Sequence, residues 1–255
     1  MTITTTAILA SILAGLATGL GALPIYFKKE FSKQSLDVGI GFSAGVMLVA
    51  SFLSLILPGI EESQKVYSEL LSLPIVLASI LAGYLFIIFI HEFLPHEHFI
   101  KETDMQHNRK VSRVYLIVFA ICLHNFPEGL AVGVGFSGDA QGGGIALALA
   151  IAIQNMPEGL VVAFGLLSEG ASKNRAFFIA LLSGLVEPVA AFFGFLSASI
   201  SAYSLPVALG FAGGTMLFVI CQEMLPELFR EGHEKNATLG VIIGVLSMIS
   251  IDFYL

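Results

Sequence analysis

Residues 113–136 read RVYLIVFAICLHNFPEGLAVGVGF, an apolar run of helix length with His124, Asn125 and Glu128 near its centre. A helix of about 20 predominantly apolar residues spans the hydrocarbon core of a bilayer. A carboxylate at the centre of such a helix costs about 2.5–3.5 kcal/mol on the insertion scale, so it is expected to face inward and to have a partner. This stretch therefore predicts a membrane helix that carries a buried polar site.

The composition of the whole chain is that of an integral membrane protein. Of its 255 residues, 56% are hydrophobic and 12% are charged, and the mean hydropathy is +0.89, whereas soluble domains carry about 25% charged residues. The net charge of −7 favours cations and disfavours nucleic acid as a partner, because phosphate binding needs a basic face. Cys122 and Cys221 both lie in apolar runs, which excludes a disulfide framework and a CxxC zinc motif.

Charge-poor runs predict an all-α integral membrane protein with eight transmembrane helices, in a single polytopic domain covering residues 1–255. The long stretch 176–222 is too long for one crossing, and the segment 201–206, which ends in proline, is the natural break. The predicted spans are 6–27, 36–57, 72–93, 113–136, 143–166, 175–200, 206–228 and 238–255.

The positions of lysine and arginine predict the orientation, because cytoplasmic loops carry an excess of these residues. All basic residues except Lys65 follow the first, third, fifth or seventh predicted span, so they gather on one side of the membrane. Lys65 is on the opposite side. Residues 1–27 contain no Asp, Glu, Lys or Arg, and the basic group follows the apolar stretch, which is typical of an N-out anchor rather than a signal peptide. We therefore expect a multi-pass protein of the cell membrane with both termini outside.

The polar motif of the fourth span occurs again thirty residues later. Residues 124–129 read HNFPEG and residues 154–159 read QNMPEG. In the first copy, His124 and Glu128 are four residues apart and share a helix face. Pro127 and Pro157 have no N–H to donate, so they are expected to kink the two helices beside the polar residues, as in the broken helices of transporter sites.

Three carboxylates are placed near the middle of the predicted spans: Glu128, Glu158 and Glu187. Apart from Arg113 and Arg175 at the first position of their spans, no Lys or Arg lies within the spans to neutralise them, so the counter-charge is either protons or a metal cation. Imidazole and carboxylate ligands suit divalent transition metals such as zinc or iron. The alternative is a proton-coupled carrier or exporter of another substrate, in which the three glutamates relay protons. A relay does not need His124 and several amides at the same depth, which favours the metal.

Histidines also gather in the predicted cytoplasmic loop 94–112. The segment HEFLPHEH does not fit the HExxH motif of metalloproteases, because His91 and His96 are five residues apart with a proline between them. No nucleophile motif appears either, so we expect no enzymatic activity and no prosthetic group. The loop is interpreted either as a solvated segment or as a low-affinity metal relay. The relay would consist of His91, Glu92, His96, His98 and Glu223.

These motifs resemble those of the ZIP (Zrt/Irt-like) family of divalent metal transporters, and the resemblance extends over the whole chain. It rests on the two copies of the motif and on Glu187-Pro188. It implies a ZIP-type helix bundle with a binuclear metal centre in the middle of the membrane, in which Glu128 and Glu158 bridge the ions. One ion would be held by His124, Glu128, Gln154 and Glu158, and the other by Asn125, Glu128, Asn155, Glu158 and Glu187.

One residue departs from the common family pattern. Many members have His where this chain has Gln154, and the glutamine is similar to the pattern of the GufA-type bacterial branch. A neutral amide binds a transition metal more weakly than imidazole does. Zinc is the first expectation for the transported ion, with iron, manganese and cadmium as alternatives. The resemblance also implies a homodimer and an elevator mechanism, in which helices one, four, five and six slide against helices two, three, seven and eight.

Overall fold

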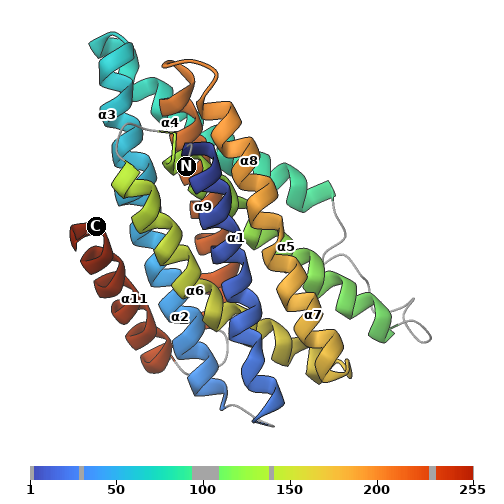
Figure 1. The fold of residues 1–255 in the computed structure, drawn as a ribbon. Coiled ribbons are helices and arrows are strands. Elements are labelled where there is room, and N and C mark those ends of the chain that lie inside the picture. Colours follow the sequence, from blue (N-terminus) through green and yellow to red (C-terminus); the bar gives the residue numbers. More distant parts are fainter. Residues whose placement is uncertain (1–2, 29–31, 94–108, 138–140, 230–233, 255) are drawn as a thin grey trace.

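The computed structural model describes residues 3–28, 32–93, 109–137, 141–229 and 234–254, and within these ranges every regular element is a helix. Figure 1 shows the helices as one elongated bundle. The α-helices are α1 (Ile3–Ala22), α2 (Lys33–Ala50), α3 (Leu57–Val66), α4 (Glu69–Phe93), α5 (Arg109–Gly135), α6 (Gln141–Ser168), α7 (Lys173–Gly184), α8 (Val186–Ala198), α9 (Ser204–Val219), α10 (Leu225–Leu228) and α11 (Glu234–Tyr254). The shorter elements are a 3-10 helix, η1 (Leu23–Tyr26), and two π-helices, η2 (Ser51–Ile56) and η5 (Ile220–Met224).

Seven helical segments in the described part of the chain are long and apolar enough to cross a membrane. Four of them combine several elements: α1 and η1 in Thr5–Tyr26, α2, η2 and α3 in Lys33–Val66, α7 and α8 in Lys173–Ala198, and α9 and η5 in Ser204–Met224. Helix α5, which has 27 residues and carries His124, is a further long helix. The all-helical fold is thereby confirmed, whereas eight crossings and the side on which the termini lie stay predictions.

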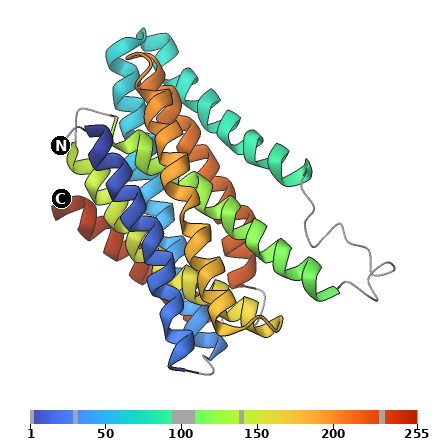
Figure 2. The same cartoon turned by 45° about the vertical axis from the view of Figure 1, so that its right-hand side comes forward.

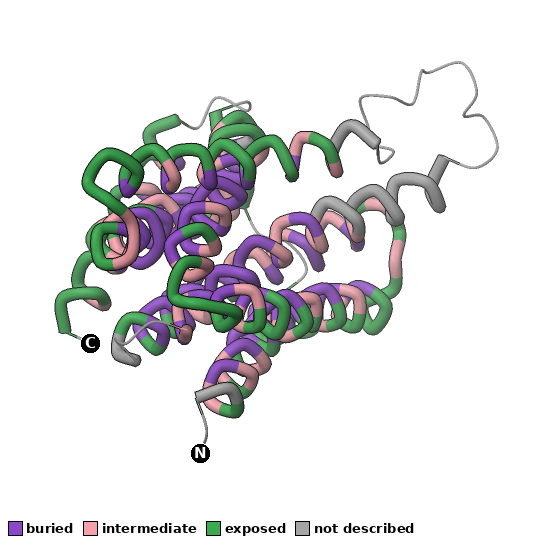
Figure 3. The backbone as a smooth tube through the Cα atoms, turned by 90° about the horizontal axis from the view of Figure 1, so that it is seen from above, coloured by how far each residue is buried: buried purple, intermediate pink, exposed green. Residues whose placement is uncertain are grey.

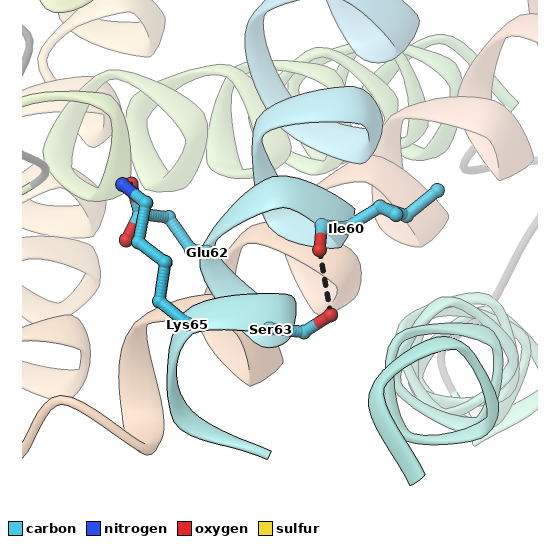
Figure 4. Close-up of polar contacts among 4 residues, drawn as sticks. All are labelled: Ile60, Glu62, Ser63 and Lys65. Carbon is cyan, nitrogen blue, oxygen red and sulfur yellow. Dashed lines mark hydrogen bonds and ion pairs between the residues drawn. The ribbon is translucent and has the colours of Figure 1, made fainter. Parts of the chain in front are cut away.

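The second helical segment is longer than its predicted range. The apolar run was expected to end near residue 57, but α3 continues the helix to Val66. Its last two turns contain Glu61, Glu62 and Lys65, so the end of the apolar run does not coincide with the end of the helix. Figure 4 shows this polar end, where Lys65 Nζ lies 2.6 Å from Glu62 Oε1.

The prolines of the repeated motif do not end their helices. Both α5 and α6 continue through Pro127 and Pro157. A helix break lies at Leu185, between α7 and α8, where the backbone N–H bonds to the carbonyls of Leu182 and Ser183. This break directly precedes the first turn of α8, which holds Glu187.

The helices form two sets that pack most closely within themselves. The ligand bundle consists of α1, α5, α6, α7 and α8, in which α1 packs on α6 and α5 packs on α8. The support bundle consists of α2, α3, α4, α9 and α11, in which α2 packs on α11 and α4 packs on α9. Figures 1 and 2 show α2 beside α11 and α1 beside α6 and α7 in both views. Seen from above, buried residues line the inner faces of the helices (Figure 3).

Glycines permit the close packing inside each bundle. A Cβ at Gly133 of α5 would collide with the backbone of Ala191 in α8, and one at Gly159 of α6 would collide with the backbone of Thr18 in α1. In the support bundle, a Cβ at Gly45 of α2 would collide with the backbone of α11. Small residues allow membrane helices to approach this closely. At every described glycine where a Cβ would come closer than about 3.4 Å to another helix's backbone, both helices belong to the same bundle.

This packing predicts unequal costs for two substitutions in α6. Gly159→Ala is expected to lower the stability of the protein in detergent by about 1–3 kcal/mol, because the methyl group would push α6 away from α1. Gly165→Ala is the matched control, since nothing lies within 4 Å of its Cβ position. Thermal unfolding of both variants in one detergent measures the difference. Equal midpoints would show that the α1–α6 contact is not this tight.

Candidate metal site

The repeated motif brings its polar residues together because α5 and α6 are consecutive, antiparallel helices (Figure 1). The Gln154 amide Nε2 donates a hydrogen bond to Glu128 Oε1 at 2.8 Å. The Asn155 amide Nδ2 donates to Glu187 Oε1 at 2.6 Å and to the carbonyl of Ala14 at 3.0 Å. Each amide of α6 is thus tied to a carboxylate of a neighbouring helix, and all four of these side chains are fully buried.

Glu158 lines a cavity together with His124. It is within electrostatic range of His124, Glu128 and Glu187. His124 Nε2 in turn lies 3.2 Å from Glu223 Oε2, which comes from η5 of the support bundle. A cavity of about 280 Å³ opens beside these residues. Its polar lining consists of Thr18, His124, Asn125, Glu158 and Glu223.

The site contains an excess of buried acceptor oxygens. Six side chains each have one buried oxygen without a hydrogen-bond partner among the described residues. An unpaired buried polar group costs about 1–3 kcal/mol, and native proteins seldom leave several of them together. Carboxylate and amide oxygens are also ligands for cations. The six atoms are Glu128 Oε2, Gln154 Oε1, Asn155 Oδ1, Glu158 Oε1, Glu187 Oε2 and Glu223 Oε1.

Acidic and histidine side chains alone do not complete an ion site in this arrangement. Within the described ranges, no three His, Cys, Asp or Glu side chains are grouped closely enough to hold a metal. Any complete coordination shell here must therefore include the amides of Asn125, Gln154 and Asn155, or other oxygen atoms. These amides line the cavity or bond to the carboxylates already.

The proposed relay residues are only partly placed by the structure. His96 and His98 lie outside the described residues, as do the side chains of His91 and Glu92 at the end of α4. Glu223 is described, and it contacts His124 directly. Sequence reasoning did not predict that contact, because the two residues are 99 positions apart and nothing local in the sequence links α5 to η5.

Thr18 was not predicted as a site residue either. It is one of five hydroxyl residues in an apolar helix without any charged residue, and such a residue is normally a packing residue. Its only sequence signal is that it is polar at a helix centre. The structure places it in the wall of the cavity beside His124 and Glu158.

The fold and the site define a multi-pass helical membrane protein with a buried polar cluster rich in acceptor oxygens. A family model described as ZIP Zinc transporter matches residues 96–252. The zinc transporter GufA of Myxococcus xanthus is 44% identical over 97% of this chain and 98% of its own length. The zinc transporter ZIPB of Bordetella bronchiseptica is 39% identical over 92% of this chain and 77% of its own. ZupT of Clostridium perfringens, also named a zinc transporter, is 32% identical over 95% and 93%.

The chain belongs to the ZIP family, which confirms the resemblance found in the motifs. Membership in this family supports transport of divalent metal ions, and the family is one of transporters rather than enzymes.

Proposed function

We propose that this protein carries zinc into the cytoplasm through a binuclear site in the middle of the cell membrane, formed by α5, α6 and α8. The observation that carries the proposal is the set of six buried oxygens that lack a donor. No Lys or Arg is among the residues that line the cavity or contact the site's carboxylates in the described structure. A divalent cation would satisfy these oxygens and neutralise the glutamates together.

The contacts support a division into two ion positions. In the first, Gln154 and Glu128 are already paired, with His124 and Glu158 beside them. In the second, Asn155 and Glu187 are paired, and Asn125 of α5, which lines the cavity with Glu158, is proposed to complete the set. Glu128 and Glu158 serve both positions, and because no three acidic or histidine side chains are grouped closely enough to hold a metal in the described structure, these side chains must move closer together when an ion binds. The amides of Gln154 and Asn155 would then exchange their bonds to the carboxylates for contacts of their unpaired oxygens with the ion.

The positions of the helix ends support the proposed topology of eight crossings with both termini outside. The end of α1 and the starts of α2, α7 and α11 lie at one end of the bundle (Figure 1). Lys28, Lys33, Lys173, Arg175 and Lys235 are found at these helix ends. Basic residues gather on the cytoplasmic side of membrane proteins, so this end is assigned to the cytoplasm.

The two bundles support a sliding mechanism of transport. The backbones of each bundle are held together by close glycine contacts, which would let each bundle move as a unit. Between the bundles the contacts are of another kind. Gly39 faces only the side chain of Pro157, the Ser43 hydroxyl donates to the carbonyl of Gln154 at 2.8 Å, and Glu223 pairs with His124. Such side-chain contacts can break and form again while the ligands travel with their bundle.

Uptake by purified protein in proteoliposomes tests the proposed function. A panel of zinc, iron, manganese and cadmium is offered outside, with the pH set separately on each side. Zinc entry that saturates at low concentration is the expected result. Proton movement without metal movement would instead favour the relay of Glu128, Glu158 and Glu187.

Acidification is expected to weaken metal binding. Imidazole and carboxylate must be deprotonated to bind a metal, so protons compete with the ion for His124, Glu128, Glu158 and Glu187. The apparent dissociation constant for zinc should therefore rise as the pH falls from neutral to mildly acidic values. Isothermal titration at several pH values measures it, and release of protons on binding at neutral pH is the accompanying sign. A dissociation constant that does not depend on pH would contradict this ligand set.

A further inference from the structure

Buried hydroxyl groups in this protein follow a regular pattern. A serine or threonine inside a helix ordinarily donates to the carbonyl three or four residues earlier. Figure 4 shows one case, in which Ser63 Oγ donates to the carbonyl of Ile60 at 2.7 Å. Seven of the ten buried hydroxyl residues in the described ranges follow this rule, namely Ser11, Ser51, Ser63, Ser72, Ser79, Ser183 and Thr215.

Three buried hydroxyls depart from the pattern. Ser43 bonds across to α6, while Thr18 and Ser54 have no hydrogen-bond partner among the described residues. Ser54 lies on η2 and does not line the cavity. Thr18 does line the cavity, and its side chain is 1% exposed. Thr18 is therefore the unpaired buried hydroxyl residue among those that line the cavity.

The structure explains why Thr18 cannot use its own helix. The carbonyl four residues earlier belongs to Ala14, which already accepts from the Asn155 amide at 3.0 Å in addition to the bond of the helix itself. A carbonyl has two lone pairs, so this acceptor is filled. The carbonyl three residues earlier belongs to Gly15, and it is packed against Gly184 of α7. The Thr18 hydroxyl also lies beside Gly184, 2.9 Å from where a Cβ would be.

We propose that Thr18 Oγ1 is a direct oxygen ligand of the divalent cation in this cavity, beside His124, Asn125 and Glu158. The inference rests on the proposed function and adds to it a ligand from α1, a helix without any residue of the repeated motif. The hydroxyl is neutral, so it contributes to coordination without adding charge. A group that is buried, unpaired and next to metal-type ligands gains most when an ion supplies the missing contact.

Zinc binding by isosteric variants tests the proposal. Thr18→Val keeps the shape of the side chain and removes the oxygen, and we expect the dissociation constant for zinc to rise about tenfold. Thr18→Ser keeps the oxygen and should bind close to wild type. Ser11→Ala is the matched control, because Ser11 is a buried hydroxyl of the same helix that is bonded to Ile8. Equal binding by Thr18→Val and wild type would overturn the proposal.

A second variant, which should gain an absorption band when Co²⁺ binds, tests the proposal if Thr18→Val does not fold. In protein whose two native cysteines are replaced by serine, Thr18→Cys would offer a thiolate to the ion, and Ser11→Cys is the control. A thiolate bound to Co²⁺ gives an intense near-ultraviolet absorption band. We expect this band on adding Co²⁺ to Thr18→Cys and not to Ser11→Cys. If Co²⁺ still binds but the absorption band is absent from both Thr18→Cys and Ser11→Cys, the proposal is also overturned.

The two proposals fail in different ways. If the wild-type protein binds no zinc in the same assay, the proposed function is wrong. If the wild type binds zinc and the Thr18 variants behave like the Ser11 controls, the metal site stands and only the role of Thr18 is wrong.

Discussion

Glu158→Ala is expected to abolish zinc uptake while the protein still inserts and folds. Glu158 is the carboxylate proposed to serve both ion positions, and it interacts electrostatically with His124 and both other glutamates. Its removal takes away a charged ligand and most of the attraction for a cation at the centre of the site. Initial uptake in proteoliposomes should fall by at least about 100-fold, since even partners outside the first coordination sphere cost about 10–100-fold in metal affinity.

Glu169→Ala is the control for this experiment, because Glu169 directly follows the end of the same helix and does not line the cavity. It removes the same charge from the chain and should leave uptake near the wild-type rate. Matched amounts of folded protein, measured by size-exclusion chromatography, exclude a loss through misfolding. Uptake at the wild-type rate by Glu158→Ala would show that the site is assigned to the wrong residues.

The helices could be predicted from the sequence because hydropathy is a local property. An apolar run long enough to cross a bilayer forms a helix whatever packs against it, since its backbone groups must bond to one another. Hydropathy does not determine where a helix ends once the chain is polar. Residues 57–66 are polar enough to leave the membrane and still continue a helix to Val66, so the apolar run ended before the helix did.

The break in the ligand bundle lies before a proline outside the repeated motif. Pro127 and Pro157 were expected to kink α5 and α6, and both helices continue through these prolines. A proline removes one hydrogen bond, and neighbouring helices can support the turn that loses it. Leu185, where the chain does change helix, comes three residues before Pro188. A proline has no N–H to bond to the carbonyl four residues earlier, here that of Gly184, and its ring crowds that turn, so this break has a signal in the sequence.

The polar residues of the site divide into those that a local sequence pattern predicts and those that only the structure brings to the site. His124, Glu128, Gln154 and Glu158 stand out because a repeated local motif places them on helix faces in the membrane interior. The contributions of Thr18 and Glu223 come from helices that meet α5 and α6 only in three dimensions. A single hydroxyl or a carboxylate near a helix end carries no local pattern. Residues of this kind are found from unpaired atoms and contacts in the structure.

Replacing His124 should weaken zinc binding far more than replacing the loop histidines His96 and His98 together. His124 lines the cavity beside Glu158 and Asn125, and its imidazole has a fixed position on α5. On the relay interpretation of the sequence, the loop histidines only receive the ion on its way into the cytoplasm. Ligands in a solvated loop would hold an ion weakly, and a loop does not fix the geometry of a site built on helices.

The experiment compares His124→Ala with the double variant His96→Ala/His98→Ala at matched expression. We expect zinc affinity to fall at least about tenfold for His124→Ala and to stay near wild type for the double variant, whose uptake changes only modestly. Glu223→Gln adds a third arm, because it removes the charge that contacts His124 and leaves the imidazole in place. If the loop variant loses binding as completely as His124→Ala, the cytoplasmic histidines belong to the primary site. The proposed separation between a site on helices and an exit relay in the loop would then be wrong.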